Sequence, residues 1–291
     1  MNETYNFWVI GGDLRQAHLA QLLAADGHEV HIYALEQGAH AAPLALCESQ
    51  PDNIGLADCV IFPLPAVSVP GQLHAPLSDR EHPLVSILPH LHSTQLLCGG
   101  RCNANTSLLL QRNGLYLHDY FIREELVVAN AVPTAEGAVQ IAMEELPITL
   151  HGARVLVLGF GRVGTLTAHR FDRLGAKVTV AARSCAQRAW AQAFGFAALP
   201  LQPLANHMEH FDLVINTIPV TLLGEEELRR LPARTPIIDL ASKPGGVDME
   251  AAARLGRQVV WALSLPGKVA PLTAASCLRD TIYNILREAG T

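Results

Sequence analysis

Residues 154–164 read RVLVLGFGRVG, an apolar strand that runs directly into a glycine-rich turn. Gly159, Gly161 and Gly164 stand in G-x-G-x-x-G order, a helical pattern follows, and a second apolar strand ends about 20 residues later. In such a unit the first glycine permits a tight turn, the second lets the backbone approach a pyrophosphate, and the third allows close helix–strand packing. The phosphates would lie at the N-terminus of the helix. The predicted pyrophosphate contacts are Gly159, Phe160, Gly161, Arg162, Val163 and Gly164.

The end of the second strand indicates which dinucleotide is bound. Residues 178–184 read VTVAARS, so neutral Ala182 stands where NAD enzymes usually place a carboxylate for the ribose 2′-hydroxyl. Arg183 and Ser184 follow, and a guanidinium beside a hydroxyl suits a 2′-phosphate. We therefore expect NADP rather than NAD as the cofactor. The alternative is that Arg183 is an ordinary solvated arginine.

The same order of strand, glycine turn, helix and strand occurs at the beginning of the chain. A strand at 7–10 runs into Gly11-Gly12, then come a helix at 15–25 and a strand at 29–33. Two such openings predict an α/β protein of two doubly wound parallel-sheet domains. The first opening lacks the third glycine, so we expect this flavodoxin/Rossmann-like half to bind substrate and not a second dinucleotide. The predicted domains are 1–131 and 132–291.

Further elements complete the second domain. Pro133 and Thr134 are typical helix-start signals, and they predict an interdomain helix over 133–146. A last helix, 273–286, has an apolar face that could pack back onto the first domain. Four more strands bring the count to that of a full Rossmann domain. They are expected near 197–199, 213–217, 237–240 and 259–263.

Composition limits the function classes. The chain has 291 residues, 49% of them hydrophobic and 16% charged, which is typical of a globular enzyme. A net charge of -6 provides no basic field for nucleic acid or an anionic membrane. No apolar run approaches the roughly 18 residues that span a bilayer. The N-terminus lacks the pattern of a signal peptide and the six cysteines are scattered, so we expect a cytoplasmic protein with reduced thiols.

Several stretches together resemble one family, the A subunit of dipicolinate synthase. They run almost from end to end of the chain, and PTAEGA, DLASKPGG and LPGKVAP are much more specific than the glycine motif. The stretches are GGDLRQ (11–16), NAVPTAEGAVQIAME (130–144), ITLHGARVLVLGFGRVG (148–164), IIDLASKPGGVD (237–248) and LPGKVAPLTA (265–274). One position departs from the family pattern: after LPGKVAP this chain has Leu272, where related chains often have a basic or polar residue. Leu272 is not among the predicted site residues.

The resemblance implies a reaction, a partner and a layout. The family oxidises dihydrodipicolinate to dipicolinate, the calcium chelator of bacterial endospores, and passes the hydride to NADP. A smaller flavoprotein-like B subunit works with it, and we also expect a homo-oligomer. The two-domain layout resembles that of hydroxyacid dehydrogenases, with a cleft between the domains. Two alternatives stay open: another NAD(P)-dependent hydroxy- or imino-acid dehydrogenase, and a non-catalytic NADP-binding subunit.

A small dicarboxylate substrate needs cations or backbone N–H groups for both of its carboxylates. Arg15, with Asp13, stands just past a strand end and is a candidate anchor; Arg123 is another, unless it simply pairs with Glu124 or Glu125. Free N–H groups at the predicted helix start would also receive a carboxylate. The substrate-binding candidates are therefore Asp13, Arg15, Arg123, Asn130 and Thr134, with Lys243 and Lys268 as further cations.

Other strand ends supply cofactor contacts and candidate bases. Thr217, Ile218 and Pro219 follow the fourth strand of the second domain, and Ala241 and Lys243 follow the fifth. Neighbouring Asn216 could instead satisfy the loop backbone. The proton acceptor is open: His118, Glu136 and Lys268 are candidates, and water is another.

A metal centre is not expected. His90, His92, Cys98 and Cys102 are of the types that bind zinc, but their spacing is loose and Gly99-Gly100 suggests an ordinary turn.

Overall fold

The computed structural model describes residues 4–290 and divides the chain into two compact units. One contains the chain up to Asn130 together with the segment from Ala270 onward, and the other is Ala131–Val269. The division lies within one residue of the boundary predicted from the sequence. It falls inside a single helix, α4 (Glu124–Glu145).

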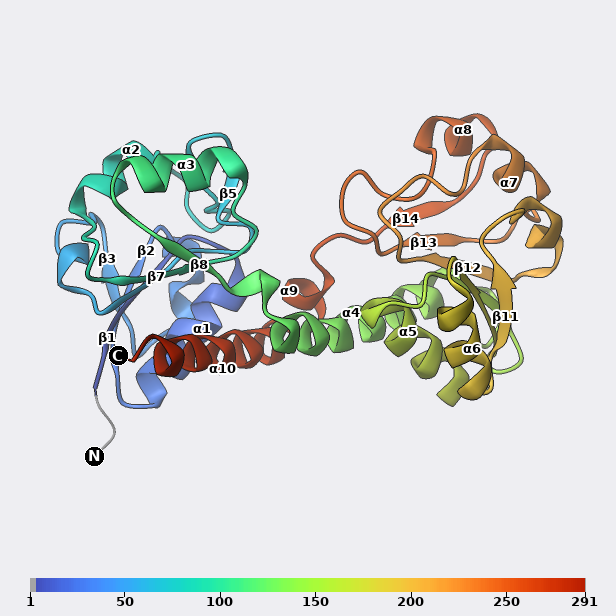
Figure 1. Ribbon diagram of the computed structural model, residues 1–291, viewed down its shortest axis with the longest axis horizontal. Coiled ribbons are helices and arrows are strands. Elements are labelled where there is room, and N and C mark those ends of the chain that lie inside the picture. The colour runs from blue at the N-terminus through green and yellow to red at the C-terminus, as the bar shows by residue number, and fades with distance from the viewer. Residues whose placement is uncertain (1–3, 291) are drawn as a thin grey trace. The chain divides into compact units, whose positions relative to one another are not determined.

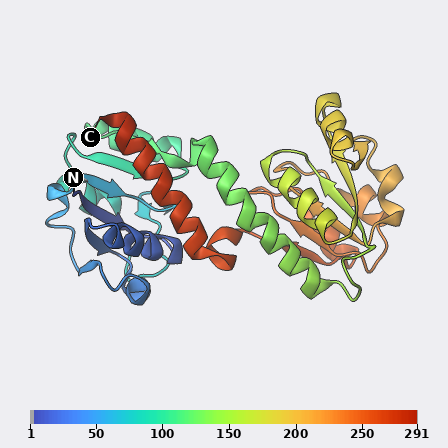
Figure 2. The same ribbon diagram turned by 90° about the horizontal axis from the view of Figure 1, so that it is seen from below.

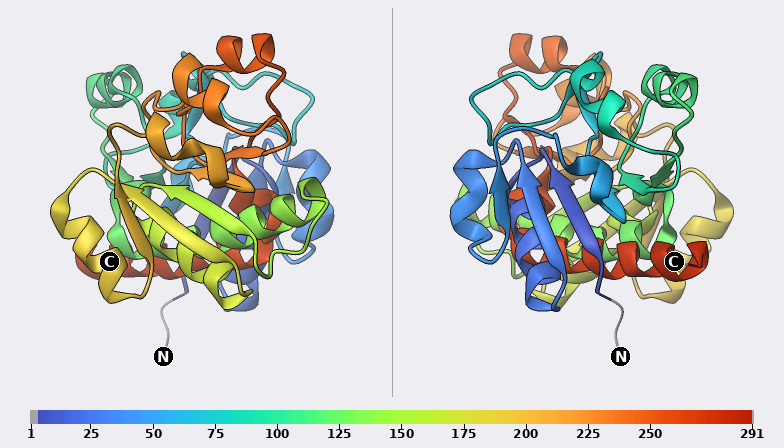
Figure 3. Two further views of the ribbon diagram at one scale, coloured as in Figure 1. Left: turned by 90° about the vertical axis from the view of Figure 1, so that its right-hand side faces the viewer. Right: turned by 90° about the vertical axis from the view of Figure 1, so that its left-hand side faces the viewer.

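The first unit is a parallel six-stranded sheet in the order β3-β2-β1-β4-β7-β8 (Figure 1; Figure 3, right). Phe7 and Val9 point into one core and Trp8 and Ile10 into another, so this sheet is buried on both faces. Its strands are β1 (Asn6–Ile10), β2 (Glu29–Tyr33), β3 (Leu46–Glu48), β4 (Cys59–Ile61), β7 (Leu96–Gly99) and β8 (Leu117–Asp119). The other elements are α1 (Leu14–Ala25), α2 (Leu84–Ile87), α3 (Ala104–Arg112) and the antiparallel pair β5 (Val67–Val69) and β6 (Gln72–Leu73).

The C-terminal helix α10 (Pro271–Ala289) belongs to this first unit. It lies alongside α1 (Figure 2), and Leu278 and Ile282 are buried in the same core as Phe7. The predicted domain 132–291 is therefore wrong for the residues after Val269. The prediction that the apolar face of the last helix packs back onto the first domain is confirmed.

The second unit is a parallel sheet in the order β11-β10-β9-β12-β13-β14 (Figure 3, left). In order of appearance this is 3-2-1-4-5-6, the Rossmann arrangement, so the predicted fold class is confirmed. Its strands are β9 (Arg154–Leu158), β10 (Lys177–Ala182), β11 (Ala197–Pro200), β12 (Leu213–Asn216), β13 (Ile237–Asp239) and β14 (Val259–Trp261). Its helices are α5 (Arg162–Arg173), α6 (Cys185–Ala193), α7 (Glu225–Arg230), α8 (Met249–Arg254) and α9 (Leu265–Val269).

Helix α4 corrects the predicted interdomain helix, because it begins at Glu124 and contains Pro133 in its interior. Buried Leu126 belongs to the core of the first unit and Ala138 to that of the second, so tertiary packing stabilises the helix on both sides of the proline. Among the described residues, α4 is also the helix long and apolar enough to cross a membrane, which the sequence analysis did not anticipate. Its most apolar window is 44% buried in the protein, and Leu126 and Ala138 pack into the two cores.

The packing of α10 predicts a contrast between two substitutions on that helix. Ile282→Ala should lower the free energy of unfolding by about 2–5 kcal/mol, because a fully buried side chain is replaced by a cavity. Leu272→Ala, at a side chain that is 55% exposed, should change it by no more than about 0.5 kcal/mol. Denaturant unfolding measures both, and equal effects would contradict this placement of α10.

Candidate dinucleotide and substrate sites

Gly159 and Gly164 are required by the packing of the β9–α5 turn. Gly159 has φ +98°, and a Cβ there would lie 2.4 Å from the Thr217 Oγ1 atom. That hydroxyl donates to the Leu158 carbonyl at 2.8 Å. A Cβ on Gly164 would lie 2.2 Å from the Gly159 carbonyl oxygen, so α5 approaches the strand end as closely as a glycine allows. Gly159 and Gly164 therefore determine the shape of the turn.

Gly161 is different, because a Cβ added there would meet nothing within 4 Å. Its φ of -93° is open to any residue, and it is the N-cap of α5, whose first turn contains Arg162 and Val163. Phe160 is buried in the core, so only its backbone faces the turn. Open space beside the N–H groups of a helix start fits a pyrophosphate that approaches the backbone. These residues fit a dinucleotide.

The two glycines predict opposite outcomes on substitution by alanine. Gly161→Ala should lower the free energy of unfolding by less than about 1 kcal/mol, the cost of alanine at an N-cap, but weaken dinucleotide binding about tenfold or more, because the methyl group occupies the space for phosphate. Gly164→Ala should destabilise the fold by about 1–3 kcal/mol through overpacking against a carbonyl. Thermal unfolding and dinucleotide titration separate the two, and full affinity in a folded Gly161→Ala protein would contradict this site.

The end of β10 contains two guanidinium groups, of which the sequence predicted one. Arg183 is exposed, while the Ser184 hydroxyl caps α6 by accepting from the Gln187 N–H at 3.1 Å. The Nη1 atom of Arg188 donates to the carbonyls of Ala182 and Arg183, both at 2.9 Å. Arg188 was missed because only the first turn of α6 brings its side chain back to the strand end.

A buried polar network fixes the loops after β12 and β13. The Asn216 amide donates to the Asp239 Oδ1 atom at 2.8 Å and to the Ile218 carbonyl at 2.9 Å. Asp239 in turn accepts from the N–H groups of Ala241, at 3.0 Å, and Gly246, at 2.7 Å. Asn216 thus takes the alternative role of satisfying the loop backbone. Asp239, which the sequence analysis did not single out, organises both loops.

The predicted cofactor contacts after β12 and β13 therefore lie on loops that are fixed by hydrogen bonds to the Asp239 carboxylate. Thr217, Ile218 and Pro219 follow β12, and Ala241 and exposed Lys243 follow β13. The Ala241 carbonyl also accepts from the Trp261 indole at 2.9 Å. Both loops leave the carboxyl edge of the sheet, where open α/β sheets bind their ligands.

In the first unit, the buried Arg15 forms an ion pair with the half-buried Asp13 at the end of β1. Asp13 caps α1, and its carboxylate accepts from Nε of Arg15 at 2.9 Å and from Nη2 at 2.8 Å. Nη2 also donates to the Leu64 carbonyl, at 3.0 Å, which links β1 to the segment after β4. Within the described residues Nη1 has no hydrogen bond, so one edge of a guanidinium that is only 7% exposed stays available to an anion.

His74 joins this pair, although no sequence pattern pointed to it. Its carbonyl accepts from the Gly12 N–H at 2.7 Å, which holds the loop after β6 against the turn after β1. Burial raises the pKa of Asp13, but the hydrogen bonds and charge of Arg15 outweigh this, so the net pKa is below its ordinary value. Burial lowers the pKa of the His74 imidazole, Asp13 raises it and Arg15 lowers it, so it too is below its ordinary value.

Arg123 forms ion pairs within the protein, which was the alternative to a role as substrate anchor. It forms a bidentate ion pair with Glu288 of α10, both contacts at 2.6 Å, and its Nε donates to Glu125 at 2.9 Å. The hydrogen bonds to Glu288 and then to Glu125 raise the pKa of this guanidinium. We therefore withdraw Arg123 as a substrate anchor.

The predicted carboxylate site at a helix start is also wrong, because Asn130, Thr134 and Glu136 lie in the interior of α4. A helix interior uses its N–H groups internally and leaves none for a ligand. The Glu136 carboxylate lies 3.6 Å from Arg170 of α5, and Lys268 is exposed on α9.

His118, the remaining candidate base, lies on β8 with its ring edge-on to Tyr116, and burial lowers its pKa. The structure thus places His118 in the first unit, and Glu136 and Lys268 in the second.

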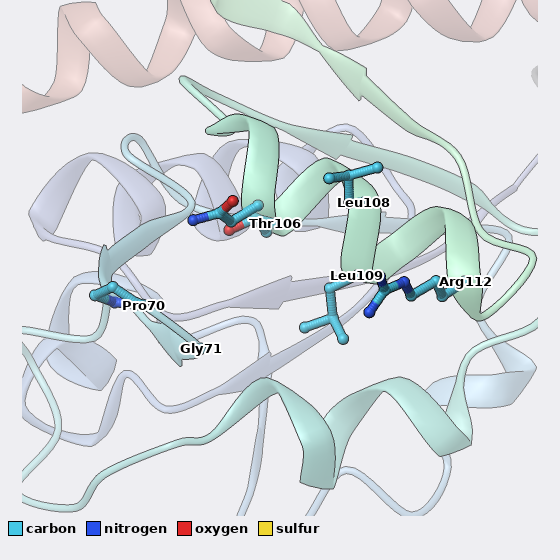
Figure 4. A pocket seen from close by; sticks show the side chains of 7 residues that line it. Pro70, Gly71, Thr106, Leu108, Leu109 and Arg112 are labelled. Atoms are coloured by element: carbon cyan, nitrogen blue, oxygen red, sulfur yellow. The ribbon is translucent and has the colours of Figure 1, made fainter.

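Two other features contribute nothing to these sites. Residues 4–290 contain no group of three or more His, Cys, Asp or Glu side chains that could hold a metal ion, the loose set around Cys98 included. A cavity of about 330 Å³ lies between the β5–β6 turn and α3 (Figure 4). Its lining, with Gly71, Leu109 and Arg112, contains none of the predicted site residues.

Comparison with known proteins agrees with the two units. Residues 6–121 match the N-terminal domain of the dipicolinate synthase A subunit, and residues 130–251 match the NAD-binding domain of D-isomer specific 2-hydroxyacid dehydrogenases. The second unit is thus a nicotinamide dinucleotide-binding domain of dehydrogenase type.

Individual relatives extend the match to the whole chain. The dipicolinate synthase A subunit of Bacillus subtilis is 33% identical over 96% of this chain and 95% of its own length. The crystal structure of the corresponding Bacillus halodurans protein has a TM-score of 0.89 at 29% identity and covers 97% of both chains. An NADP(+) shikimate dehydrogenase of Syntrophobacter fumaroxidans is 31% identical over 47% of this chain and 56% of its own length.

Proposed function

The chain belongs to the family of dipicolinate synthase A subunits, and on that premise we propose that it oxidises dihydrodipicolinate to dipicolinate with NADP. The observation that carries the proposal is the 33% identity across 96% of the chain. The open turn at Gly161 and the Asp13–Arg15 pair add a cofactor site and an anion site with the required chemistry.

Each unit contributes a separate part of the proposed reaction. When bound, NADP supplies the nicotinamide ring that accepts a hydride. The N–H groups of the α5 start receive its pyrophosphate, and the loops fixed by Asp239 line the adjacent strand ends. In the first unit the Nη1 edge of Arg15 binds a substrate carboxylate, because a guanidinium held by Asp13 is already oriented. Aromatisation supplies the driving force, so orientation and exclusion of water are the main tasks of the protein.

The preference for NADP over NAD follows from charge at the end of β10. Ala182 places no carboxylate against a 2′-phosphate, Arg183 is exposed beside it, and the Arg188 guanidinium is held at the same strand end. The NADP(+) in the name of the shikimate dehydrogenase relative supports the same choice. Lys243 and Lys268 are further cations for cofactor or substrate.

Arg183→Ala should weaken NADP binding roughly ten- to a hundredfold and leave NAD binding unchanged, since a charge-assisted contact contributes about 1.5–3 kcal/mol. Titration with each dinucleotide measures the ratio. Arg230→Ala on α7, which removes an exposed arginine paired with Glu226, is the control and should alter neither affinity. An unchanged ratio in Arg183→Ala would make Arg183 a solvated arginine and leave the preference unexplained.

Assembly and location belong to the same proposal. The name of the Bacillus subtilis relative designates one of several subunits, which supports a second, flavoprotein-like B subunit. A homo-oligomer and a cytoplasmic site of action complete the proposal.

The decisive experiment is turnover of freshly generated dihydrodipicolinate with NADP and, separately, with NAD, with and without the B subunit. Reduced nicotinamide absorbance and dipicolinate formation are both measured. We expect NADP reduction with stoichiometric dipicolinate. NADP binding without turnover in any combination would favour a non-catalytic role, and turnover of a hydroxy or imino acid instead would favour another dehydrogenase of this architecture.

A further inference from the structure

We propose that His74 is the proton acceptor of the oxidation, working beside the Arg15 guanidinium that binds the substrate. This inference rests on the proposed function and deepens it. None of the candidate bases from the sequence shares the surroundings of the Asp13–Arg15 pair, whereas His74 does.

The backbone holds His74 at the carboxyl edge of the first sheet. Its carbonyl accepts from Gly12, and its N–H donates to the Ala66 carbonyl at 3.2 Å. These two bonds tie the loop after β6 to the segments after β1 and β4, which are neighbouring strands at the centre of the sheet. Gly11 has φ +60°, and a Cβ there would lie 2.8 Å from the His74 carbonyl oxygen. Backbone contacts thus fix the place of His74 in this loop, which a catalytic group requires.

The strand order places a topological switch point at this edge. β1 and β4 are adjacent, and the chain continues to β2 on one side and to β7 on the other. Ligands of open α/β sheets bind at such a switch point, outside the carboxyl ends of the strands. Arg15 and His74 therefore lie where a substrate of the first unit is expected.

The charges around the imidazole suit a base. Asp13 and Arg15, both at the start of α1, are the charged groups that act on it, and burial is the largest influence on its pKa. The net pKa lies below the ordinary histidine value of 6.5, so the imidazole is neutral at pH 7 and free to accept a proton. A protonated His74 would then be stabilised by Asp13 and by the substrate carboxylates.

The chemistry balances with one base. Aromatisation removes two hydrogens from the dihydropyridine ring. One leaves with its bonding electron pair as a hydride, which reduces NADP. The other leaves as a proton, its electron pair becomes the new double bond of the ring, and an imidazole nitrogen of His74 takes the proton and later releases it to water.

His74→Gln is the test, with His40→Gln as the matched control because His40 is an exposed histidine in a short 3-10 helix of the same unit. We expect kcat for His74→Gln to fall about a hundredfold or more, with NADP affinity and thermal unfolding unchanged. The wild-type protein should lose kcat/KM in acid with a midpoint below pH 6.5, and the variant should lack this limb. Added imidazole should restore part of kcat.

A second measurement does not depend on turnover. Calorimetric titration of the protein with dipicolinate, in buffers of different ionisation enthalpy, counts the protons that binding takes up. Near pH 6.5 the wild-type protein should take up a proton that His74→Gln does not. Wild-type turnover and proton uptake that both persist in His74→Gln would overturn the inference and leave the proposed function standing. A wild-type protein that binds dipicolinate with His74-dependent proton uptake but oxidises nothing would overturn the function and keep His74 as a group at the anion site. A wild-type protein that does neither would overturn both.

Discussion

The contact between Gly164 and the Gly159 carbonyl is the constraint on which the dinucleotide domain depends. With only 2.2 Å available for a side-chain carbon, α5 is held directly above the end of β9, and its first N–H groups face the open space beside Gly161. A larger residue would move the helix start away from the strand end, and the phosphate position would move with it. Close packing at Gly159 and Gly164 fixes the turn, and the space beside Gly161 stays open.

The first unit has the same parallel architecture but a different turn after its first strand. Where the second unit has a glycine fingerprint, the first has Gly11 and Gly12 followed by an ion pair, half-buried Asp13 with buried Arg15. An arginine this buried is stable only because its partner and the Leu64 carbonyl are both in place. In the proposed function, N–H groups receive a phosphate in one unit and a guanidinium edge receives a carboxylate in the other.

Buried polar groups at strand ends serve a common purpose in both units. Asp239 satisfies N–H groups of the loop after β13 and holds Asn216, while His74 and Gly12 join two loops through their backbones. Each arrangement fixes irregular backbone at the carboxyl edge of a sheet, where ligands bind. Asp239 and Asn216 are paired in this way, and an unpaired buried polar group would cost about 1–3 kcal/mol.

The sequence by itself determined the six strands of the second unit, the first two strands of the first unit, the glycine turn and the class of both domains, because strand periodicity and turn chemistry act between neighbours in the chain. It also placed Asp13 with Arg15, whose ion pair depends on contacts within a few residues. Only the tertiary structure decided that α4 starts before Pro133, that the second unit ends at Val269, and that Arg123 pairs with Glu288. The same holds for Asp239 and His74, whose partners come from other strands or loops. Such contacts are set by strand order and core packing, which no local pattern in the chain contains.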